Sequence, residues 1–266
     1  MSDQTKAKPN GIQGGIGASI AVAIVFLIGW EWGPEFFNIP PYIIPPASSV
    51  YFEFFHAIEK ENLFFHTGIT LLETIAGFII GSLMGMIIGY ILGISPKAEF
   101  VFSPYILALQ IAPKVAFAPL FVVWFGFTVY PKILVAVLIV FFPIMVNVLG
   151  AIRTVDPDMV NLARTFNATR WQIFKMIEFR DAMPPLFSGL RIGATLAIIG
   201  VAVGEMVGGS EGLGAVLIFG GGSGNTALTF VAIIMLTVVG ILAYVAVVLV
   251  EKRVLHYLPR SEFNSI

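Results

Sequence analysis

The feature that most constrains this chain is a series of long apolar segments that contain almost no charged residues. About 20 consecutive apolar residues in a helix cross the hydrocarbon of a bilayer, and one central charge costs about 2.5 to 3.5 kcal/mol. Only 12% of the 266 residues are charged, whereas an ordinary soluble domain carries about 25%. With 58% hydrophobic residues, the chain has more apolar surface than one soluble core of this length can bury. We therefore expect an all-α integral membrane protein surrounded by lipid.

Six segments meet this criterion, which predicts about six transmembrane helices. The third is the least regular, because Pro104, Pro113 and Pro119 each lack a backbone donor. Lys114 also interrupts its apolar run, so this segment is continuous, kinked or broken. The six segments are Gly11–Trp30, Ile69–Ile94, Val101–Phe127, Ile133–Ile152, Leu186–Val207 and Thr226–Val250.

The distribution of lysine and arginine predicts the orientation of these segments. If six spans are threaded from a cytoplasmic N-terminus, eleven cations fall on the cytoplasmic side and only Lys60 and Lys132 on the other. Both termini are then cytoplasmic. Trp30 and Trp32 occupy the position of a signal-peptide cleavage site, so the first segment is interpreted as an uncleaved anchor. The eleven cations are Lys6, Lys8, Lys97, Arg153, Arg164, Arg170, Lys175, Arg180, Lys252, Arg253 and Arg260.

The chain divides into three parts on this basis. Residues 1–66 form an N-terminal tail, the anchor and an external region, residues 67–250 form the core, and residues 251–266 form a cytoplasmic tail. Within the external region, Ser48–Glu61 carries apolar residues at helical spacing and is predicted to be an interfacial helix. This helix either packs on the membrane surface or docks an external partner.

The second apolar segment carries glycines at every fourth position. Small residues at this spacing let a second helix approach to backbone contact, which favours helix association in lipid. The strip is predicted to pack against another helix of the same chain, with a seam between two copies as the alternative. Its members are Gly77, Gly81, Gly85, Gly89 and Gly93.

The sequence contains no signal for several classes of function. The net charge of −1 gives no sign of a nucleic-acid partner, there are no cysteines, and the three histidines lack metal-ligand spacing. The chain contains no Gly-Lys dipeptide and no G-x-G-x-x-G motif, so it is not expected to bind ATP itself. No catalytic residue, cofactor or metal is predicted.

The segment Gly208–Gly212 formally matches the G-x-S-x-G motif of serine hydrolases, with Ser210 as the nucleophile. That motif requires a strand before it and a helix after it, with a histidine and an acid within reach, and none of this context is evident. We expect a turn followed by a short re-entrant segment on the external side.

Ionisable residues within the spans are candidates for a pathway or gate, because they tend to face a cavity or a partner in lipid. Lys114, Arg191 and Glu205 are the candidates, and Glu73 lies nearby in the second span. All but Lys114 lie close to a predicted span end, where a side chain reaching to the interface is a sufficient alternative explanation. No chain of acidic residues or histidines predicts a proton relay, which weakens a self-sufficient secondary transporter.

The longest cytoplasmic connection, Arg153–Met183, is predicted to contain two short helices. Asp156 precedes Pro157 in an N-cap pattern, and Thr169 with Gln172 matches a capping box. Asn167 lies between the two helices and readily adopts the left-handed backbone of a tight turn. The connection is therefore expected to form a helix-turn-helix.

This connection resembles the cytoplasmic loop of bacterial ABC importer permeases of the nitrate, sulfonate and taurine type. Those permeases carry Glu-Ala-Ala, three residues, Gly, nine residues and Ile-x-Leu-Pro in the loop that docks on the partner ATPase. The opening Glu is replaced by Asn161, the turn Gly by Asn167 and the closing Pro by Arg180. The positions that correspond to the docking loop are Asn161, Ala163, Asn167, Ala168 and Ile177.

The resemblance extends from about residue 45 to residue 250. The stretches Ala118–Leu120, Trp124–Gly126, Ser188–Arg191, Gly204–Met206 and Gly212–Gly214 are similar to recurrent stretches of that family. The resemblance implies a type I importer permease in the bacterial inner membrane, in which two permease copies form the pathway. Two ATPase subunits would then bind the cytoplasmic loops, and an external solute-binding protein would deliver the substrate.

The resemblance leaves the substrate open between a small anion, such as nitrate, a sulfonate or taurine, and a heteroaromatic vitamin precursor. Two alternative functions also remain at this point. A secondary transporter would need no partner subunits, and an intramembrane hydrolase would depend on Ser210.

Overall fold

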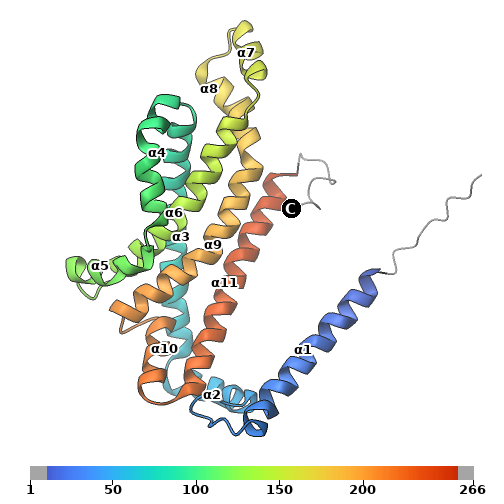
Figure 1. The fold of residues 1–266 in the computed structure, drawn as a ribbon, viewed down its shortest axis with the longest axis vertical. Coiled ribbons are helices and arrows are strands. Elements are labelled where there is room, and N and C mark those ends of the chain that lie inside the picture. Colours follow the sequence, from blue (N-terminus) through green and yellow to red (C-terminus); the bar gives the residue numbers. More distant parts are fainter. Residues whose placement is uncertain (1–10, 257–266) are drawn as a thin grey trace, which may run out of the picture.

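The structure, a computed structural model, describes residues 11–256 of the chain. Every regular element in this range is a helix, which confirms the all-α prediction (Figure 1). Five helical units are long and apolar enough to cross a membrane: α1 (Gly11–Phe36), α3 (Leu63–Gly93), α6 (Val129–Thr154), the continuous unit Arg170–Gly208, and α11 (Thr226–Val254). A sixth span is obtained if the bent pair α4 and α5 counts as one.

The third predicted span is broken. It consists of α4 (Pro96–Ile111), one 3₁₀ turn (Lys114–Phe117) and α5 (Ala118–Phe125), and the two halves meet at 82°. Pro113 lacks an N–H and disfavours helical geometry in the residue before it, and Ala112 accordingly has an extended ψ of 135°. The span also begins earlier than Val101, because the Ser95 side chain caps the helix and Pro96 occupies its first turn.

The glycine strip of α3 lies against α6 of the same chain. A Cβ atom on Gly77 would lie 2.6 Å from Ala136 Cβ, and one on Gly89 would lie 2.6 Å from the Met145 carbonyl oxygen. Gly81, Gly85 and Gly93 face Val140, Phe141 and Ile152 in the same way. The strip therefore brings two helix backbones into close contact within one chain.

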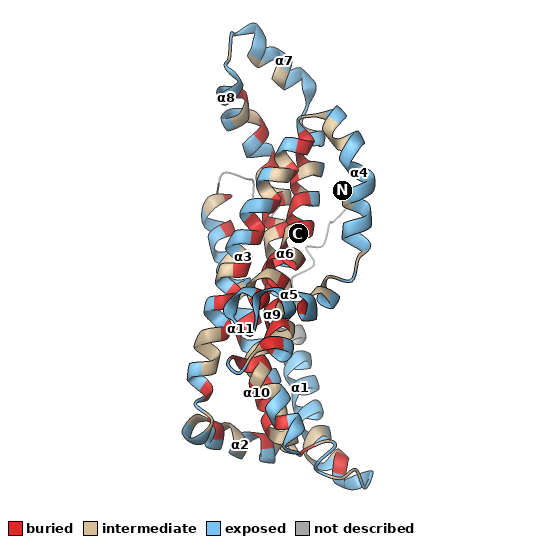
Figure 2. Cartoon of the chain, turned by 90° about the vertical axis from the view of Figure 1, so that its left-hand side faces the viewer, coloured by how far each residue is buried: buried red, intermediate tan, exposed pale blue. Residues whose placement is uncertain are grey.

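The helix α6 also packs against α9 (Phe179–Gly208) through glycines. A Cβ atom on Gly200 would lie 2.6 Å from Ala136 Cα, and one on Gly204 would lie 2.5 Å from Lys132 Cα. The helices α3, α6 and α9 thus pack against one another at the centre, and the buried residues of α6 run along its length (Figure 2).

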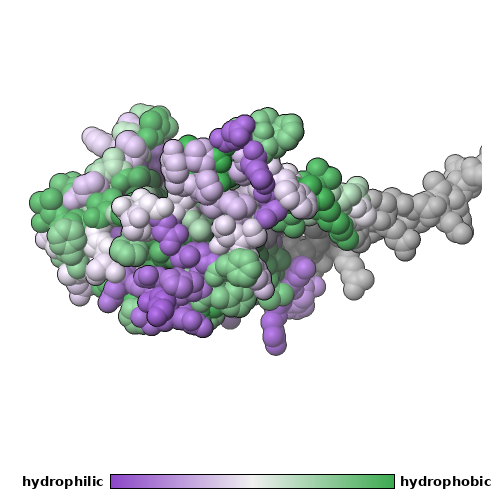
Figure 3. Space-filling view, turned by 90° about the horizontal axis from the view of Figure 1, so that it is seen from below, coloured by the Kyte–Doolittle hydropathy of each residue, from purple (hydrophilic) through white to green (hydrophobic). Residues whose placement is uncertain are grey.

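The remaining helices surround this centre. At one end, called the α2 end, α2 (Ala47–Lys60) crosses below α10 (Leu213–Gly222) and the start of α11 (Figure 1). Figure 3 looks onto the α2 end and shows hydrophilic side chains beside hydrophobic surface. At the other end, called the α7 end, α7 (Pro157–Thr165) and α8 (Arg170–Ile173) project beyond the long helices. Helix α1 diverges from the bundle, and only 6% of its span is buried.

Candidate functional site

The connection at the α7 end forms the predicted helix-turn-helix, and its caps are those that the sequence indicates. The Asp156 side chain accepts a hydrogen bond of 2.8 Å from Asp158 N, and Pro157 occupies the first position of α7. Thr169 and Gln172 form the capping box, with Thr169 N donating to Gln172 Oε1 at 2.7 Å. We call residues 156–173 the elbow.

The turn of the elbow depends on Asn167. This residue has a φ of 58°, in the left-handed region that asparagine tolerates better than most residues. The left-handed residue lets Ala168 N reach back to the Ala163 carbonyl oxygen at 3.0 Å, which closes the end of α7. Of the other positions that correspond to the docking loop, Asn161 lies on α7, and Ile177 lies beyond the elbow.

The second helix of the elbow does not end as a separate short helix, which corrects the sequence prediction. It continues from α8 through a π-helical turn, Phe174–Glu178, into α9 as one unit of 39 residues. The fifth span therefore has no boundary near Leu186. A helix that is continuous from the elbow into the membrane transmits displacement along its axis, since its backbone hydrogen bonds resist bending.

The π-helical turn is tied to α3 by a carboxylate that the sequence analysis did not identify. Glu178 is buried and accepts hydrogen bonds from Arg170 Nη1 and from Tyr90 Oη, both at 2.9 Å. The Tyr90 ring also packs edge-on against Phe174, with 4.9 Å between the ring centres. The elbow is therefore joined to the neighbouring span as well as to its own.

The elbow exposes large apolar side chains although it projects from the bundle. Exposed apolar clusters on segments that lie in water mark protein interaction sites. Four such residues, all more than half exposed, lie on α7, the turn and α8: Met159, Leu162, Phe166 and Trp171.

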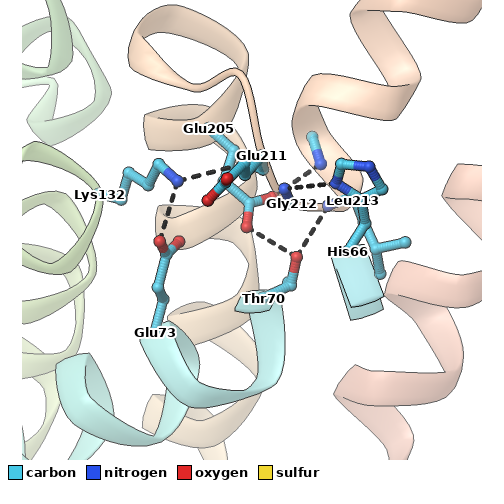
Figure 4. Close-up of polar contacts among 9 residues, drawn as sticks. His66, Thr70, Glu73, Lys132, Glu205, Glu211, Gly212 and Leu213 are labelled. Carbon is cyan, nitrogen blue, oxygen red and sulfur yellow. Dashed lines mark hydrogen bonds and ion pairs between the residues drawn. The ribbon is translucent and has the colours of Figure 1, made fainter. Parts of the chain in front are cut away.

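A buried polar cluster lies toward the α2 end, where α3, α6 and the turn before α10 meet (Figure 4). Glu205 is fully buried, with Thr70 Oγ1 donating to one carboxylate oxygen and Gly214 N to the other, both at 2.7 Å. The Thr70 hydroxyl also accepts from Leu213 N at 2.8 Å. The alternative that Glu205 reaches the membrane interface is therefore wrong, because its carboxylate is held inside the protein.

Lys132 also belongs to this cluster rather than to the external surface, where the sequence analysis placed it. Its Nζ donates to Glu73 Oε1 at 2.9 Å and to the Glu211 carbonyl oxygen at 3.1 Å. Both side chains are buried, so the interface explanation fails for Glu73 too. His66 Nδ1 accepts from Gly212 N at 3.0 Å, which fixes the same turn from the α3 side.

The G-x-S-x-G match lies in this turn and has a helix, α9, where a hydrolase would have a strand. Gly212 has a φ of +102°, and the Glu205 carboxylate occupies the space of a side chain there. This glycine therefore lets the turn pass close to Glu205. Its neighbour Ser210 is exposed.

The three candidate pathway residues are not brought together. Glu205 lies in the buried cluster, and Arg191 Nε lies 3.3 Å from Glu251 Oε2, between α9 and α11. Lys114 lies at the break between α4 and α5, where its Nζ donates to the Gln110 carbonyl oxygen. The ammonium also lies 4.9 Å from the centre of the Phe142 ring.

Comparison with known proteins places the chain in a family. Residues 77–256 match the family described as the binding-protein-dependent transport system inner membrane component. The chain is 37% identical to the riboflavin transport system permease protein RibX of Chloroflexus aurantiacus, over 88% of this chain and 87% of RibX. It is 30% identical to the formylaminopyrimidine transport permease protein ThiX of Halalkalibacterium halodurans, over 87% and 92% of the two chains. Identity to the aliphatic sulfonates transport permease protein SsuC of Bacillus subtilis is 29%, over 81% and 78%.

The chain belongs to this family and is a permease subunit of an ABC importer. Membership confirms the resemblance drawn from the loop and the recurrent stretches. Transport systems of this family work with an ATPase and a solute-binding protein.

Proposed function

We propose that the chain is one of two identical membrane subunits of the importer, with the elbow in the cytoplasm as the docking site for the ATPase. In this arrangement each elbow binds one of two ATPase subunits. ATP binding closes the ATPase pair, and the elbow moves with it. The spans then switch between outward-facing and inward-facing states.

The exposed apolar residues of the elbow carry this proposal. Phe166 at the turn is 79% exposed, and Trp171 on α8 is 68% exposed. Burial of such side chains against a partner removes apolar surface from water, at about 25 cal/mol per Å². The link from Tyr90 to Glu178 then passes the motion of the docked elbow to α3 as well as to α9.

The distribution of cations supports a cytoplasmic α7 end. Eight cations lie at this end: Lys97, Arg153, Arg164, Arg170, Lys175, Arg180, Lys252 and Arg253. Lys132 is paired inside the bundle, so Lys60 alone remains as an unburied cation at the α2 end within residues 11–256. This asymmetry follows the positive-inside rule. The α2 end then faces the outside, where the solute-binding protein delivers substrate.

The broken third span supports a pathway formed by two copies. No residue of α4 is buried in the single chain, and the backbone leaves helical geometry at Ala112 and Pro113. Non-helical backbone at membrane depth is tolerated only where protein covers it or where it lines a water-filled cavity. We infer that the α4–α5 face meets the second copy and that the break lines the pathway.

We infer further that the substrate is a heteroaromatic vitamin precursor rather than a nitrate-, sulfonate- or taurine-like anion. This choice rests on the riboflavin permease, which is 37% identical, against 29% for the aliphatic sulfonates permease of Bacillus subtilis and 24% for the nitrate import permease NrtB of Leptolyngbya laminosa. Uptake of labelled riboflavin, formylaminopyrimidine, taurine and nitrate by cells that produce the complete importer tests it. Uptake of nitrate or taurine without either heteroaromatic solute would contradict it.

The docking role is tested by changing Phe166. Phe166→Glu should lower ATP hydrolysis stimulated by the loaded binding protein at least tenfold, because a carboxylate would have to be buried in the docking surface. Phe166→Leu is the matched control and should keep most of the stimulation. Normal stimulation in Phe166→Glu would refute docking at this surface.

A further inference from the structure

Lys114, Lys132 and Arg191 are three cations of the described spans, and Lys114 is the exception among them because the other two pair with carboxylates of the chain. Lys132 lies 2.9 Å from Glu73, and Arg191 lies 3.3 Å from Glu251. Across residues 11–256, no carboxylate oxygen lies within the 4.0 Å ion-pair distance of Lys114 Nζ. Its polar contact is the Gln110 carbonyl oxygen, and the Phe142 ring lies beneath the ammonium.

The position of Lys114 makes this exception informative. The residue begins the 3₁₀ turn at the break, on a segment without buried residues. An unpaired ammonium facing lipid costs about 2.5 to 3.5 kcal/mol on insertion scales, whereas one that faces a water-filled cavity or a ligand avoids this cost. The surrounding face is apolar, with Ile111 and Val115 on either side.

The Lys114 ammonium also has N–H donors beyond the one that bonds to Gln110. A lysine carries three N–H donors, and the Gln110 carbonyl accepts one of them. The contact with Phe142 is electrostatic and leaves the other donors available. Held over a ring in an apolar setting, Lys114 offers a fixed positive charge with free donors.

We propose that Lys114 is a specificity-determining residue of the pathway, which favours solutes that present an anionic or carbonyl oxygen and disfavours cations. The proposal rests on the pathway position given under the proposed function. In a two-fold symmetric dimer a second Lys114 lies across the same pathway, which doubles the positive charge there.

The absence of cysteine from the chain allows a direct test of the local potential. Ala116→Cys places one thiol on an exposed position two residues after Lys114. The complete importer, in membrane vesicles, is treated with an anionic thiol reagent, sulfonatoethyl methanethiosulfonate, and with its cationic counterpart, trimethylammonioethyl methanethiosulfonate. The mass increase of this chain alone gives both reaction rates, and their ratio reports the potential.

The ratio of anionic to cationic rate should fall about five- to tenfold when Lys114→Met is added to Ala116→Cys. Lys114→Arg should preserve the ratio because it keeps the charge. Ser210→Cys, an exposed position at the α2 end, is the control, and its ratio should not depend on Lys114. Lys114→Gln is a second neutral variant if Lys114→Met does not assemble.

The two ways of failing are distinguishable. If Ala116→Cys reacts, but its ratio of anionic to cationic rate is the same with Lys114 and with Lys114→Met, the role of Lys114 is overturned and the pathway stays in place. An Ala116→Cys that reacts with neither reagent, with or without ATP, would show that the break does not line a water-filled pathway, and would overturn both proposals.

Discussion

At the scale of single residues, Thr70 shows how one hydroxyl group can hold two elements together inside a membrane protein. It donates to Glu205 Oε1 at 2.7 Å and accepts from Leu213 N at 2.8 Å. Both partners are buried. Loss of this hydroxyl leaves a carboxylate oxygen and a backbone N–H without their partner, and each unsatisfied buried group costs about 1 to 3 kcal/mol.

We therefore predict that Thr70→Val destabilises the chain by about 1 to 3 kcal/mol. Thr237→Val is the matched control, since the Thr237 hydroxyl is exposed and bonds only to the Ile233 carbonyl oxygen of its own helix. The midpoint of thermal unfolding in detergent measures the difference. Equal midpoints for the two variants would show that the cluster does not hold the turn.

The sequence indicates that the ionisable residues of the buried cluster lie in or beside the spans, but it does not predict which residues surround them. Glu73 and Glu205 were identified as residues of the spans, yet their predicted proximity to a span end suggested solvent contact. Lys132 directly precedes the predicted span Ile133–Ile152, so threading six spans places it on the outside. Ion pairing between α3 and α6 depends on which helix faces join, and hydropathy along one segment carries no information about that.

At the scale of elements, the contact between α3 and α6 depends on the absence of side chains. A Cβ atom on Gly85 would lie 2.8 Å from the Phe141 carbonyl oxygen, whereas one on Gly68 of the same helix would meet nothing within 4 Å. Gly85→Ala should therefore destabilise the chain, and Gly68→Ala should leave it unchanged or stabilise it by up to about 1 kcal/mol. The fraction of folded protein in detergent distinguishes them. A loss of folding in both variants would contradict this explanation.

The hydrogen bond between Tyr90 and Glu178 gives a second prediction at this scale. Tyr90→Phe removes the only hydroxyl that links α3 to the π-helical turn among the described contacts, at a cost of about 1 kcal/mol. The number of solutes transported per ATP should fall about two- to fivefold. Tyr244→Phe on the exposed side of α11 should leave this number unchanged. If Tyr90→Phe transports with the normal stoichiometry, the link plays no part in coupling.

The elbow shows which features of an element depend on residues that are close together in the sequence. Its caps and its left-handed turn depend on residues within five positions of each other, so Asp156, Thr169 and Asn167 predict them correctly. The continuation of α8 into α9 has no such local signal. It is stabilised by Glu178, whose partners Arg170 and Tyr90 are 8 and 88 residues away in sequence.

At the scale of the whole molecule, the number of spans followed from hydropathy, because five long helices and one broken pair account for all six apolar segments. The break in the third span could be predicted from the sequence only in part. Pro113 and Lys114 mark the third segment as irregular, but the 82° angle depends on how α4 packs against α3 and on how α5 packs against α6 and α9.

The proposed pair of identical subunits leads to a prediction at this scale. When two differently tagged copies of the chain are produced together with the partner subunits, purification on one tag should recover both in equal amounts. Isolation of each tagged form without the other would contradict the dimer.

The central claim, that the ATPase drives the chain through the elbow, is tested most directly by cross-linking. A cysteine introduced at Ala168 would be the only thiol of the chain. In the complete importer, a short bifunctional maleimide should join Ala168→Cys to the ATPase, and should leave Ser210→Cys at the α2 end unlinked to it. A link from Ser210→Cys to the ATPase, with none from Ala168→Cys, would contradict the account.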